Sequence, residues 1–311
     1  MDAVDARLPL VSVVTITYNH EPFIAKAIEG VLMQQVGFPI EYIIAEDCST
    51  DGTRKICEEY AAKYPDLIHL IVSEQNVGPK ENERRAFAAT RGKYIAFCEG
   101  DDYWTEPLKL QRQVDFMEAH PDYSVCFHGL KRIYDNDEIS ENTMNLDRCK
   151  NGFDVMDITS KDYLDNKYDI MSLTMFLRKS MHDTEWTSKY KSFRDTHQIY
   201  LLLRNGKGAY MQFAGAVHIK HDGGFYTSQT DLKHSLDAIN CFVELYVNNR
   251  DDAFLKKQII EVMLWCHDVS GNSGAKSEFY KTVFEKSYVV PQITIIVLSK
   301  IIFRIIKSIF K

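Results

Sequence analysis

The chain has 311 residues, of which 45% are hydrophobic and 26% are charged, and its formal net charge is -7 at pH 7. These values are typical of a globular protein, and the length is sufficient for one large domain or two smaller ones. The negative charge argues against a protein that acts mainly on nucleic acid, because that role needs a broad basic surface.

Cysteine usage and hydropathy indicate the compartment. Seven cysteines are scattered without CxxC pairs, which favours free thiols in a reducing environment. The segment 1–9 has no apolar stretch of the kind that secretory signals contain. No stretch before residue 289 is long and apolar enough to span a membrane. We therefore expect a cytoplasmic protein.

Strands and helices are predicted to alternate in the N-terminal part of the chain. Short apolar runs predict strands at 10–17, 40–45, 67–73 and 94–98. Three helices are predicted between them: the first begins near Glu21, the second ends near Lys63, and the third covers 81–91. Such alternation favours right-handed βαβ units and a mainly parallel sheet. Ligands bind at the carboxyl ends of the strands in such sheets, so we expect the polar residues that follow these strands to share one edge.

Further elements are predicted in the rest of the chain. They are a helix from Pro107 to about His120, strands over 123–134 and 170–178, a helix over about 195–204, and strands over 209–213 and 215–220. Residues 135–152 are polar and predict a long loop, and a loop of that length in a compact domain usually has a role in function. From Leu232 to about Lys286 the pattern is helical.

The acidic turn Glu99-Gly100-Asp101-Asp102 is the most informative motif. Carboxylates crowded at the end of an apolar strand are costly to bury without partners. Mg²⁺ or Mn²⁺ would accept their oxygens and could neutralise the charge of a bound diphosphate. The alternative is a solvent-exposed acidic turn before Pro107. The apolar strand before the turn and two other acidic strand ends favour the metal site.

Three segments pair an apolar strand with a polar turn: LVSVVTITYNHEPFIAKAIEGVLMQ, AEDCSTDGT and GKYIAFCEGDDYW. In order and spacing they resemble the GT-A-fold glycosyltransferases of family 2, over about Pro9 to Gly224. The resemblance implies an α/β GT-A fold, with a mainly parallel sheet flanked by helices. It also implies that Tyr18 stacks on the base of a nucleotide sugar and that Asp47 forms a hydrogen bond to that base.

The same resemblance assigns the acidic turn to the family's DXD motif. It places Asp101 towards the ribose or the metal and makes Asp102 a metal ligand. Glu99 stands where many relatives have Asp, so its contact with the metal is left open. We also assign Glu21 to the nucleotide site.

The loop after the third strand, Asn76-Val77-Gly78-Pro79-Lys80, resembles the corresponding loop of the family. Contacts with phosphate or base are expected there and on the following helix, from Lys80, Asn82 and Arg85. Solvated residues at the start of a helix are the alternative. Asp47 has an alternative role as an Asx-turn residue that opens a helix, and Tyr18 could simply cover the core.

Two residues of the second half complete the expected site. Ser192-Phe193-Arg194-Asp195 before an apolar helix resembles the family's "ED/GD" element, which implies that Asp195 deprotonates the acceptor hydroxyl. An N-cap is the alternative role of Asp195. The segment HIKHDGGF is similar to the family's R-x-H-x-G-G pattern, which implies that His221 binds the metal or the diphosphate. A structural histidine is the alternative.

The C-terminal segment 291–311 is apolar, with cations at Lys300, Arg304, Lys307 and Lys311. On a helix this spacing collects the cations on one stripe. A helix that lies in the interface of an anionic membrane has this pattern. A helix packed on the domain or on a partner chain is the alternative. Membrane binding would imply a lipid-linked acceptor and a peripheral location on the inner face of the plasma membrane.

We therefore predict a GT-A domain over 1–225, a helical extension over 226–290 and a basic amphipathic helix over 291–311. The expected reaction is inverting, metal-dependent transfer from a nucleoside-diphosphate sugar to a hydroxyl of a glycan or lipid-linked acceptor, in the synthesis of a surface polysaccharide or lipopolysaccharide. The alternatives are a catalytically inactive, membrane-attached assembly subunit and a sugar nucleotidyltransferase. The latter needs a glycine-rich loop after the first strand, where Thr17 to Glu21 contain no glycine.

Overall fold

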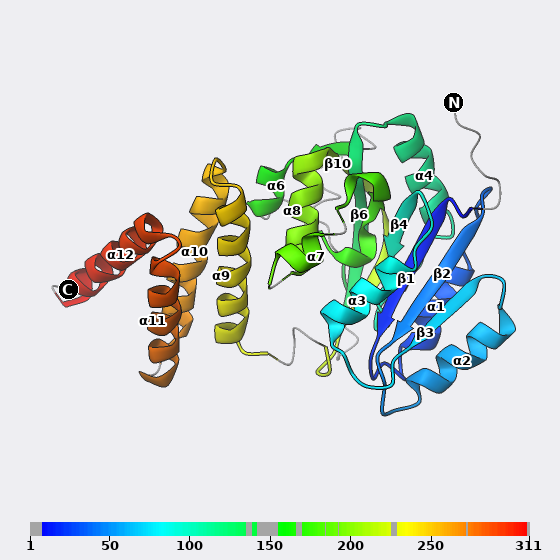
Figure 1. Ribbon diagram of the computed structural model, residues 1–311, viewed down its shortest axis with the longest axis horizontal. Helices are drawn as coiled ribbons and strands as arrows, with labels where there is room; N and C mark the ends of the chain where they lie inside the picture. Colours follow the sequence, from blue (N-terminus) through cyan, green and yellow to red (C-terminus); the bar gives the residue numbers. More distant parts are fainter. Residues whose placement is uncertain are drawn as a thin grey trace. The chain divides into compact units, whose positions relative to one another are not determined.

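The computed structural model describes residues 8–134, 139–141, 155–165, 170–183, 185–191, 193–224, 229–271 and 273–309. The chain forms two compact units (Figure 1). The first consists of Met1–Thr187 and Gln198–His221, and the second of Ser188–His197 and Asp222–Lys311. Each unit has its own hydrophobic core.

The sheet of the first unit begins with four parallel strands. They are β1 (Val11–Thr17), β2 (Ile40–Glu46), β3 (Ile68–Val72) and β4 (Tyr94–Phe97), in the spatial order β3-β2-β1-β4. In register, Val11 of β1 lies between Ile40 of β2 and Tyr94 of β4. Nearly every residue of β1 is buried, which is typical of a parallel strand covered on both faces.

The order continues from β4 through β9, β6 and β10 to β5. The bounds of these strands are β5 (Tyr103–Trp104), β6 (Tyr123–Tyr134), β9 (Phe176–Arg178) and β10 (Lys207–Lys220). Strand β9 is antiparallel to both β4 and β6, whereas β6 and β10 are parallel to each other. The sheet is therefore mainly parallel, as predicted, with antiparallel strands at β9 and β5.

Four helices accompany these strands in the predicted places: α1 (Ile24–Leu32), α2 (Thr53–Lys63), α3 (Pro79–Ala88) and α4 (Lys109–Ala119). Helix α1 buries Ile24, Ile28 and Val31, which recur at helical spacing on one face. Helix α3 begins with a proline, which suits the first turn because its N–H would lack an intrahelical partner. Figure 1 shows β1 and β2 side by side with these helices around them.

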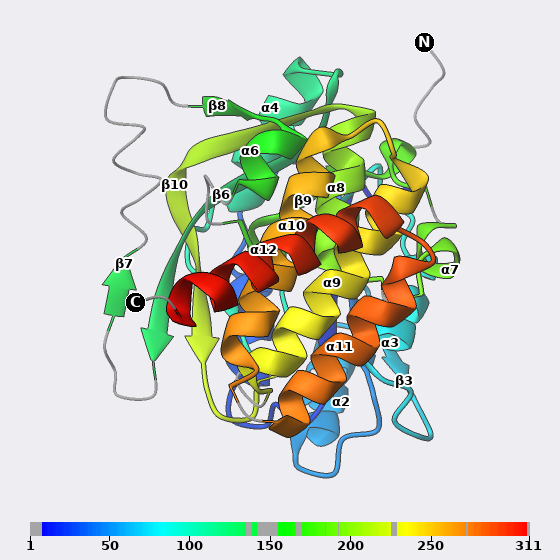
Figure 2. The same cartoon turned by 90° about the vertical axis from the view of Figure 1, so that its left-hand side faces the viewer.

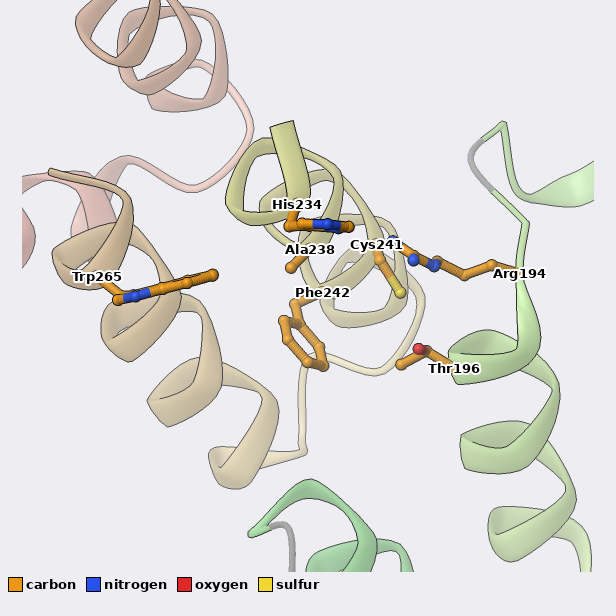
Figure 3. A pocket seen from close by; sticks show the side chains of 7 residues that line it. All are labelled: Arg194, Thr196, His234, Ala238, Cys241, Phe242 and Trp265. Carbon is orange, nitrogen blue, oxygen red and sulfur yellow. The ribbon is translucent and has the colours of Figure 1, made fainter. Parts of the chain in front are cut away.

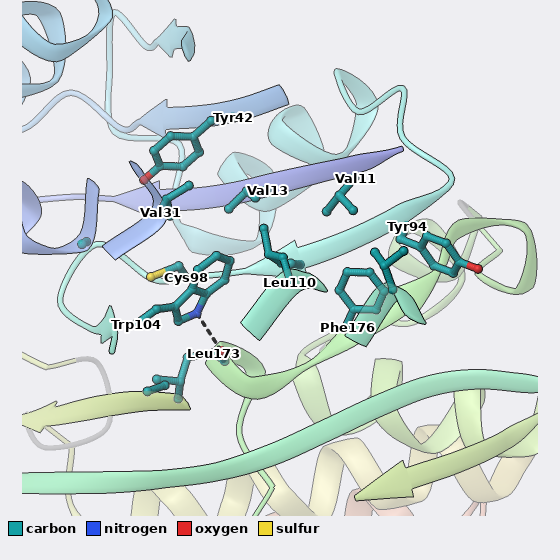
Figure 4. Close-up of a cluster of buried hydrophobic side chains, with 14 of the residues drawn as sticks. Val11, Val13, Val31, Tyr42, Tyr94, Cys98, Trp104, Leu110, Leu173 and Phe176 are labelled. Carbon is teal, nitrogen blue, oxygen red and sulfur yellow. Dashed lines mark hydrogen bonds between the residues drawn. The ribbon is translucent and has the colours of Figure 1, made fainter. Parts of the chain in front are cut away.

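Trp104 of β5 is buried in the hydrophobic core of the first unit (Figure 4). Its indole N–H donates a hydrogen bond to the carbonyl of Leu173 at 3.1 Å. The ammonium of Lys109 is fully buried, 3.8 Å from the Trp104 ring centroid, and donates to Gln113 Oε1 at 2.8 Å. Burial lowers the pKa of Lys109 to about 7. This core fixes the strands whose ends carry the polar turns.

Three predictions in the second half of this unit are wrong in extent. The strand expected over 170–178 is a 3-10 turn, η1 (Ser172–Thr174), followed by the short β9. The two strands expected over 209–213 and 215–220 are one strand, β10, because local register shifts let the chain continue along β6.

The third is the predicted loop over 135–152, which contains a strand, β7 (Ile139–Glu141), antiparallel to β6. Residues 135–138 and 142–152 lie outside the described part. The remaining elements of this part of the chain are β8 (Val155–Ile158), α6 (Ser160–Leu164), η2 (Lys179–Met181), α7 (Trp186–Lys189) and α8 (Asp195–Asn205).

The second unit is helical, as predicted, with α9 (Asp231–Asn248), α10 (Ala253–Val269), α11 (Ser273–Ser287) and α12 (Pro291–Ile309). Helices α9 and α10 run side by side (Figure 2) and bury Ile239, Val243 and Met263 between them. The Asp252 carboxylate caps α10 by accepting the N–H groups of Phe254 and Leu255. Among the described residues, no helix combines the length and apolarity needed to cross a membrane.

Candidate active site

The polar turns after β1, β2 and β4 meet at the carboxyl edge of the sheet. The N–H of Asp47 donates to the carbonyl of Thr17 at 3.0 Å, and the N–H of Gly100 donates to the carbonyl of Ile16 at 3.1 Å. Backbone hydrogen bonds therefore join each turn to the neighbouring strand. The structure thus places Tyr18, Asp47 and the acidic turn along one edge, as the parallel sheet predicts.

Asp101 lies between two imidazoles. Its Oδ2 atom is 3.3 Å from His221 Nε2 and 3.7 Å from His20 Nε2. Burial raises the pKa of Asp101, but the hydrogen bond from His221 and the proximity of His20 outweigh it and hold the pKa below its usual value. His221 is in turn packed against the ring of Phe23, with centroids 4.5 Å apart. Asp101 is therefore an ionised carboxylate held by residues from β1's turn and from the end of β10.

Asp102 is almost fully buried beside the end of β10. Its Oδ1 accepts the backbone N–H of Ile219 at 2.9 Å and lies 3.1 Å from His218 Nδ1. Burial raises the pKa of Asp102, and the charge of Asp101 adds to this effect, against the hydrogen bond from His218. Sequence reasoning gave His218 and His20 little or no role. The sequence did offer a signal for both histidines, because His218 lies in the HIKH segment and His20 closely follows β1.

Glu99 is enclosed beneath the turn. Its Oε2 atom has no hydrogen-bond partner among the residues that the structure describes. Burial and the neighbouring Asp102 raise the pKa of Glu99 to about 8. The side chain therefore favours its protonated form at neutral pH, unlike that of Asp101.

Gly100 allows the acidic turn to approach the first strand. A Cβ atom at this position would lie 2.6 Å from Thr17 Oγ1 and 2.8 Å from His20 Nδ1. Only glycine fits this distance without displacing its neighbours. The turn is therefore packed against the residues that it must meet at the sheet edge.

Asp47 holds the loop after β3. Its Oδ1 accepts the N–H of Val77 and its Oδ2 accepts the N–H of Gly78, both at 2.8 Å. Gly78 has a φ of 84°, a conformation that glycine adopts without strain. Asp47 is 2% exposed, and it forms a buried link between two turns.

The residues expected on α3 differ in their surroundings. Asn82 is buried, and its amide donates to the carbonyl of Ala45 at 2.8 Å. Arg85 donates to the carbonyl of Val72 at 2.8 Å and to Asn82 Oδ1 at 3.3 Å. These contacts tie α3 to the ends of β2 and β3. Lys80 is partly exposed on the first turn of α3.

Two residues after β1 have contrasting environments. Tyr18 is 39% exposed, so its ring is available to a ligand. Glu21 instead accepts the N–H of Gly52 at 2.9 Å, while its own N–H donates to Asp51 Oδ2 at 3.1 Å. Glu21 therefore connects the turns after β1 and β2.

Asp195 is the first residue of α8 and belongs to the second unit. Its Oδ1 accepts the N–H of Thr196 at 2.8 Å and lies 3.9 Å from Arg194 Nε. The side chain is 40% exposed. Nearby, His197 is buried with its Nδ1 3.3 Å from Cys241 Sγ, which anchors the start of α8 to α9.

The donors at the acidic turn suit a divalent cation. Among the described residues, no group of three or more His, Cys, Asp or Glu side chains is arranged to hold a metal ion. Asp101 and His221 nevertheless bring an ionised carboxylate and an imidazole within 3.3 Å, and the Asp101 side chain is 21% exposed. Oxygen and nitrogen donors of this kind fit Mn²⁺ or Mg²⁺ with diphosphate oxygens completing the shell.

The model of glycosyl transferase family 2 matches residues 12–204. The chain therefore belongs to glycosyl transferase family 2. This confirms the family and the GT-A fold that the sequence motifs indicated.

Sequence relatives share the N-terminal part. An uncharacterised protein of Mycobacterium tuberculosis is 48% identical over 125 residues, which are 40% of this chain and 36% of that protein. The putative teichuronic acid biosynthesis glycosyltransferase TuaG of Bacillus subtilis is 40% identical over 109 residues, 35% of this chain and 42% of the relative. The chain thus spans less than half the length of these relatives.

Solved structures show the same fold. TarS 1-349 of S. aureus, in complex with UDP-GlcNAc, matches with a TM-score of 0.66 and 18% identity, over 92% of this chain and 83% of that chain. The mannosyltransferase PcManGT of Pyrobaculum calidifontis, in complex with GDP-Man and Mn²⁺, matches with a TM-score of 0.53 and 14% identity, over 96% and 88%.

The Asp47 link predicts a local effect on hydrogen exchange. In Asp47→Ala the Val77 N–H loses its acceptor, whereas the Gly78 N–H keeps Asn76 Oδ1. We therefore expect exchange at Val77 to accelerate roughly tenfold or more, since a lost buried hydrogen bond costs about 1–3 kcal/mol. Mass-spectrometric hydrogen exchange on peptides that cover this loop measures the change. Asn76→Ala is the matched control. Asn76 Oδ1 accepts the Gly78 N–H but not the Val77 N–H, and Asp47 still accepts both N–H groups in this variant. Equal protection in wild type and Asp47→Ala would contradict the assignment.

Proposed function

We propose that this chain transfers a sugar from a nucleoside-diphosphate sugar to an acceptor hydroxyl, with inversion, during synthesis of a cell-surface glycan. The observation that carries the proposal is the acidic turn at the carboxyl edge of the sheet, where Asp101 meets His20 and His221. Membership of glycosyl transferase family 2 supports it, as does the similarity to a putative teichuronic acid biosynthesis glycosyltransferase.

The nucleotide is proposed to bind across the turns after β1 and β2. Tyr18 presents an exposed aromatic ring that can stack on the base. Each Asp47 oxygen accepts one backbone N–H and retains a lone pair for a base N–H. Lys80, Asn82 and Arg85 complete the proposed donor site, with Asn82 and Arg85 positioning α3 through their contacts with the strand ends.

Asp101, Asp102 and His221 are the proposed holders of Mg²⁺ or Mn²⁺. A bound cation would neutralise the charge that develops on the departing nucleoside diphosphate. The other residues would keep Asp101 ionised through His20, and orient Asp102 through His218 and Ile219. Histidines that contact ligand carboxylates in this way fix their orientation.

Asp195 is the proposed general base. Its carboxylate is partly exposed, and one of its oxygens accepts the Thr196 N–H, which fixes the side chain at the start of α8. Removal of the acceptor proton as the oxygen attacks the anomeric carbon strengthens the nucleophile at the moment when the bond forms. The leaving group is the nucleoside diphosphate.

The two alternative functions, an inactive assembly subunit and a sugar nucleotidyltransferase, predict different products. An inactive assembly subunit would keep the fold but consume no sugar nucleotide with any acceptor. A sugar nucleotidyltransferase would release diphosphate from a nucleoside triphosphate and a sugar phosphate. The turn after β1, with Asn19 at a φ of 55°, contains no glycine-rich loop of the kind that such enzymes use for phosphate.

The metal assignment predicts loss of donor turnover. Asp101→Asn and Asp102→Asn should each lower Mn²⁺-dependent hydrolysis of UDP- or GDP-sugars at least roughly tenfold, because each removes a charge from the cation site. Release of nucleoside diphosphate measures this. Asp115→Asn on α4 is the control, since Asp115 accepts only an exposed hydrogen bond from Gln111. Full activity of both site variants, or no nucleotide binding by the wild type, would refute the proposal.

The base assignment predicts a separation of binding from transfer. Asp195→Asn can still accept the Thr196 N–H, so the start of α8 should remain in place. Transfer to acceptor should fall roughly 100- to 10,000-fold while the affinity for sugar nucleotide stays near that of wild type. Calorimetry measures the affinity, and product formation measures the transfer. Equal losses of affinity and transfer would indicate a structural role for Asp195.

We also propose that α12 and the end of α11 contact an anionic membrane surface. Helix α12 buries Ile293, Val297 and Ile301 in the second unit, so part of its apolar face packs as the alternative predicted. Large apolar side chains nevertheless remain exposed along these helices and in the segment between them: Phe284, Tyr288, Ile295, Ile302 and Phe303. Lys300 is exposed, and Arg304 is half-exposed while it pairs with Asp268 at 2.9 Å. Lys311 and the side chain of Lys307 lie outside the described part.

This membrane surface is tested by co-sedimentation with vesicles of phosphatidylcholine with and without phosphatidylglycerol. Wild type should sediment with the anionic vesicles, and the double variant Ile302→Ser with Phe303→Ser should bind at least roughly tenfold more weakly, because each lost apolar side chain removes about 1.5–3 kcal/mol. Phe254→Ser on α10 is the control for an exposed aromatic residue elsewhere. Equal binding of the double variant, or no binding of wild type, would contradict the proposal.

A further inference from the structure

A pocket of about 320 Å³ lies in the second unit beside the start of α8 (Figure 3). Trp265 from α10 and Phe242 and Ala238 from α9 form its apolar wall. Arg194 and Thr196 approach from the other side, and His234 lies at the edge. The pocket therefore combines flat aromatic surface with groups that form hydrogen bonds.

Trp265 is an unusual residue to leave exposed. The chain has three tryptophans, and Trp104 and Trp186 are buried, whereas Trp265 is 43% exposed. Its indole provides a broad apolar face and one N–H donor. An aromatic ring at the wall of a concave site usually serves to bind a ligand by its face.

The polar side of the pocket belongs to the segment that carries the proposed base. Arg194 and Thr196 directly flank Asp195, and the Thr196 N–H is bound by the Asp195 carboxylate. This segment is held to α9 by the buried pair of His197 and Cys241, whose Nδ1 and Sγ atoms are 3.3 Å apart. The pocket is thus lined by the two sequence neighbours of Asp195, on a segment that is packed within the same unit.

We propose that this pocket binds a sugar residue of the acceptor and presents it to Asp195. The inference rests on the proposed transferase function and names the acceptor class as a carbohydrate. A pyranose has apolar C–H faces, which suit Trp265 and Phe242, and hydroxyl groups at its edge, which suit Arg194, Thr196 and His234. An acyl chain would match the apolar wall but would form no hydrogen bonds with the polar groups on the other side of the pocket.

The test uses methyl glycosides of glucose, galactose, N-acetylglucosamine and glucuronic acid as probes with the full chain. Saturation-transfer NMR should detect binding of at least one of them to wild type. Trp265→Ala should raise its dissociation constant at least tenfold, and Ala238→Phe, which fills the pocket without removing a polar group, should do the same. Trp265→Phe should retain most of the affinity because it keeps an aromatic face.

Phe254→Ala is the matched control, because Phe254 is an exposed aromatic residue of α10 that does not line the pocket. It should bind the probes like wild type. Near-ultraviolet circular dichroism of each variant shows whether the fold is kept. Binding by wild type that is unchanged in Trp265→Ala and Ala238→Phe, or no binding of any probe, would overturn the proposal.

Failure of this proposal is distinguishable from failure of the transferase function. A protein that consumes sugar nucleotide with Mn²⁺ but binds glycosides independently of Trp265 overturns the pocket alone. A protein that binds glycosides through Trp265 but consumes no sugar nucleotide overturns the transferase function, and with it the role of the pocket as an acceptor site.

Discussion

The crowding of three carboxyl groups at the end of one buried strand is the constraint on which the rest of the first unit depends. Glu99, Asp101 and Asp102 follow β4 within one turn, and all three are largely withdrawn from solvent. The protein gives each a different environment. Asp101 receives imidazole partners, Asp102 receives a backbone N–H and His218, and Glu99 keeps an oxygen without a hydrogen-bond partner among the described residues. These environments lower the pKa of Asp101 and raise the pKa values of Asp102 and Glu99.

The same edge uses carboxylates to join its loops. Asp47 binds two backbone N–H groups of the loop after β3, and Glu21 binds the N–H of Gly52 after β2. Glu46 is buried, and its Oε2 atom accepts a hydrogen bond from Arg54 Nε at 2.6 Å. Acceptor-only groups suit this purpose, because the carboxyl edge presents many backbone N–H donors that need partners. These links join the turns after β1, β2 and β3 at the carboxyl edge of the sheet.

The second unit brings a different kind of chemistry. Its helices bury their own core, and they leave an aromatic pocket beside Asp195 and an apolar surface on α11 and α12. Both features are exposed apolar groups, which are costly in water unless a partner covers them. Under the proposed function, the sheet edge would bind the donor and the helical unit would bind the acceptor, and one fold could then serve different glycans.

The sequence by itself determined the family, the first four strands with their helices, and the shared edge of the polar turns. Strand and helix periods are local, and parallel strands place their carboxyl ends together. Only the tertiary structure decided which partner each polar residue takes. The Asp102 carboxylate contacts His218, and the Glu21 carboxylate accepts the Gly52 N–H. The partners in each pair are far apart in the sequence, so local sequence patterns do not predict these contacts. The single long β10 and the 3-10 turn before β9 depended likewise on pairing with distant strands, which can override local propensity.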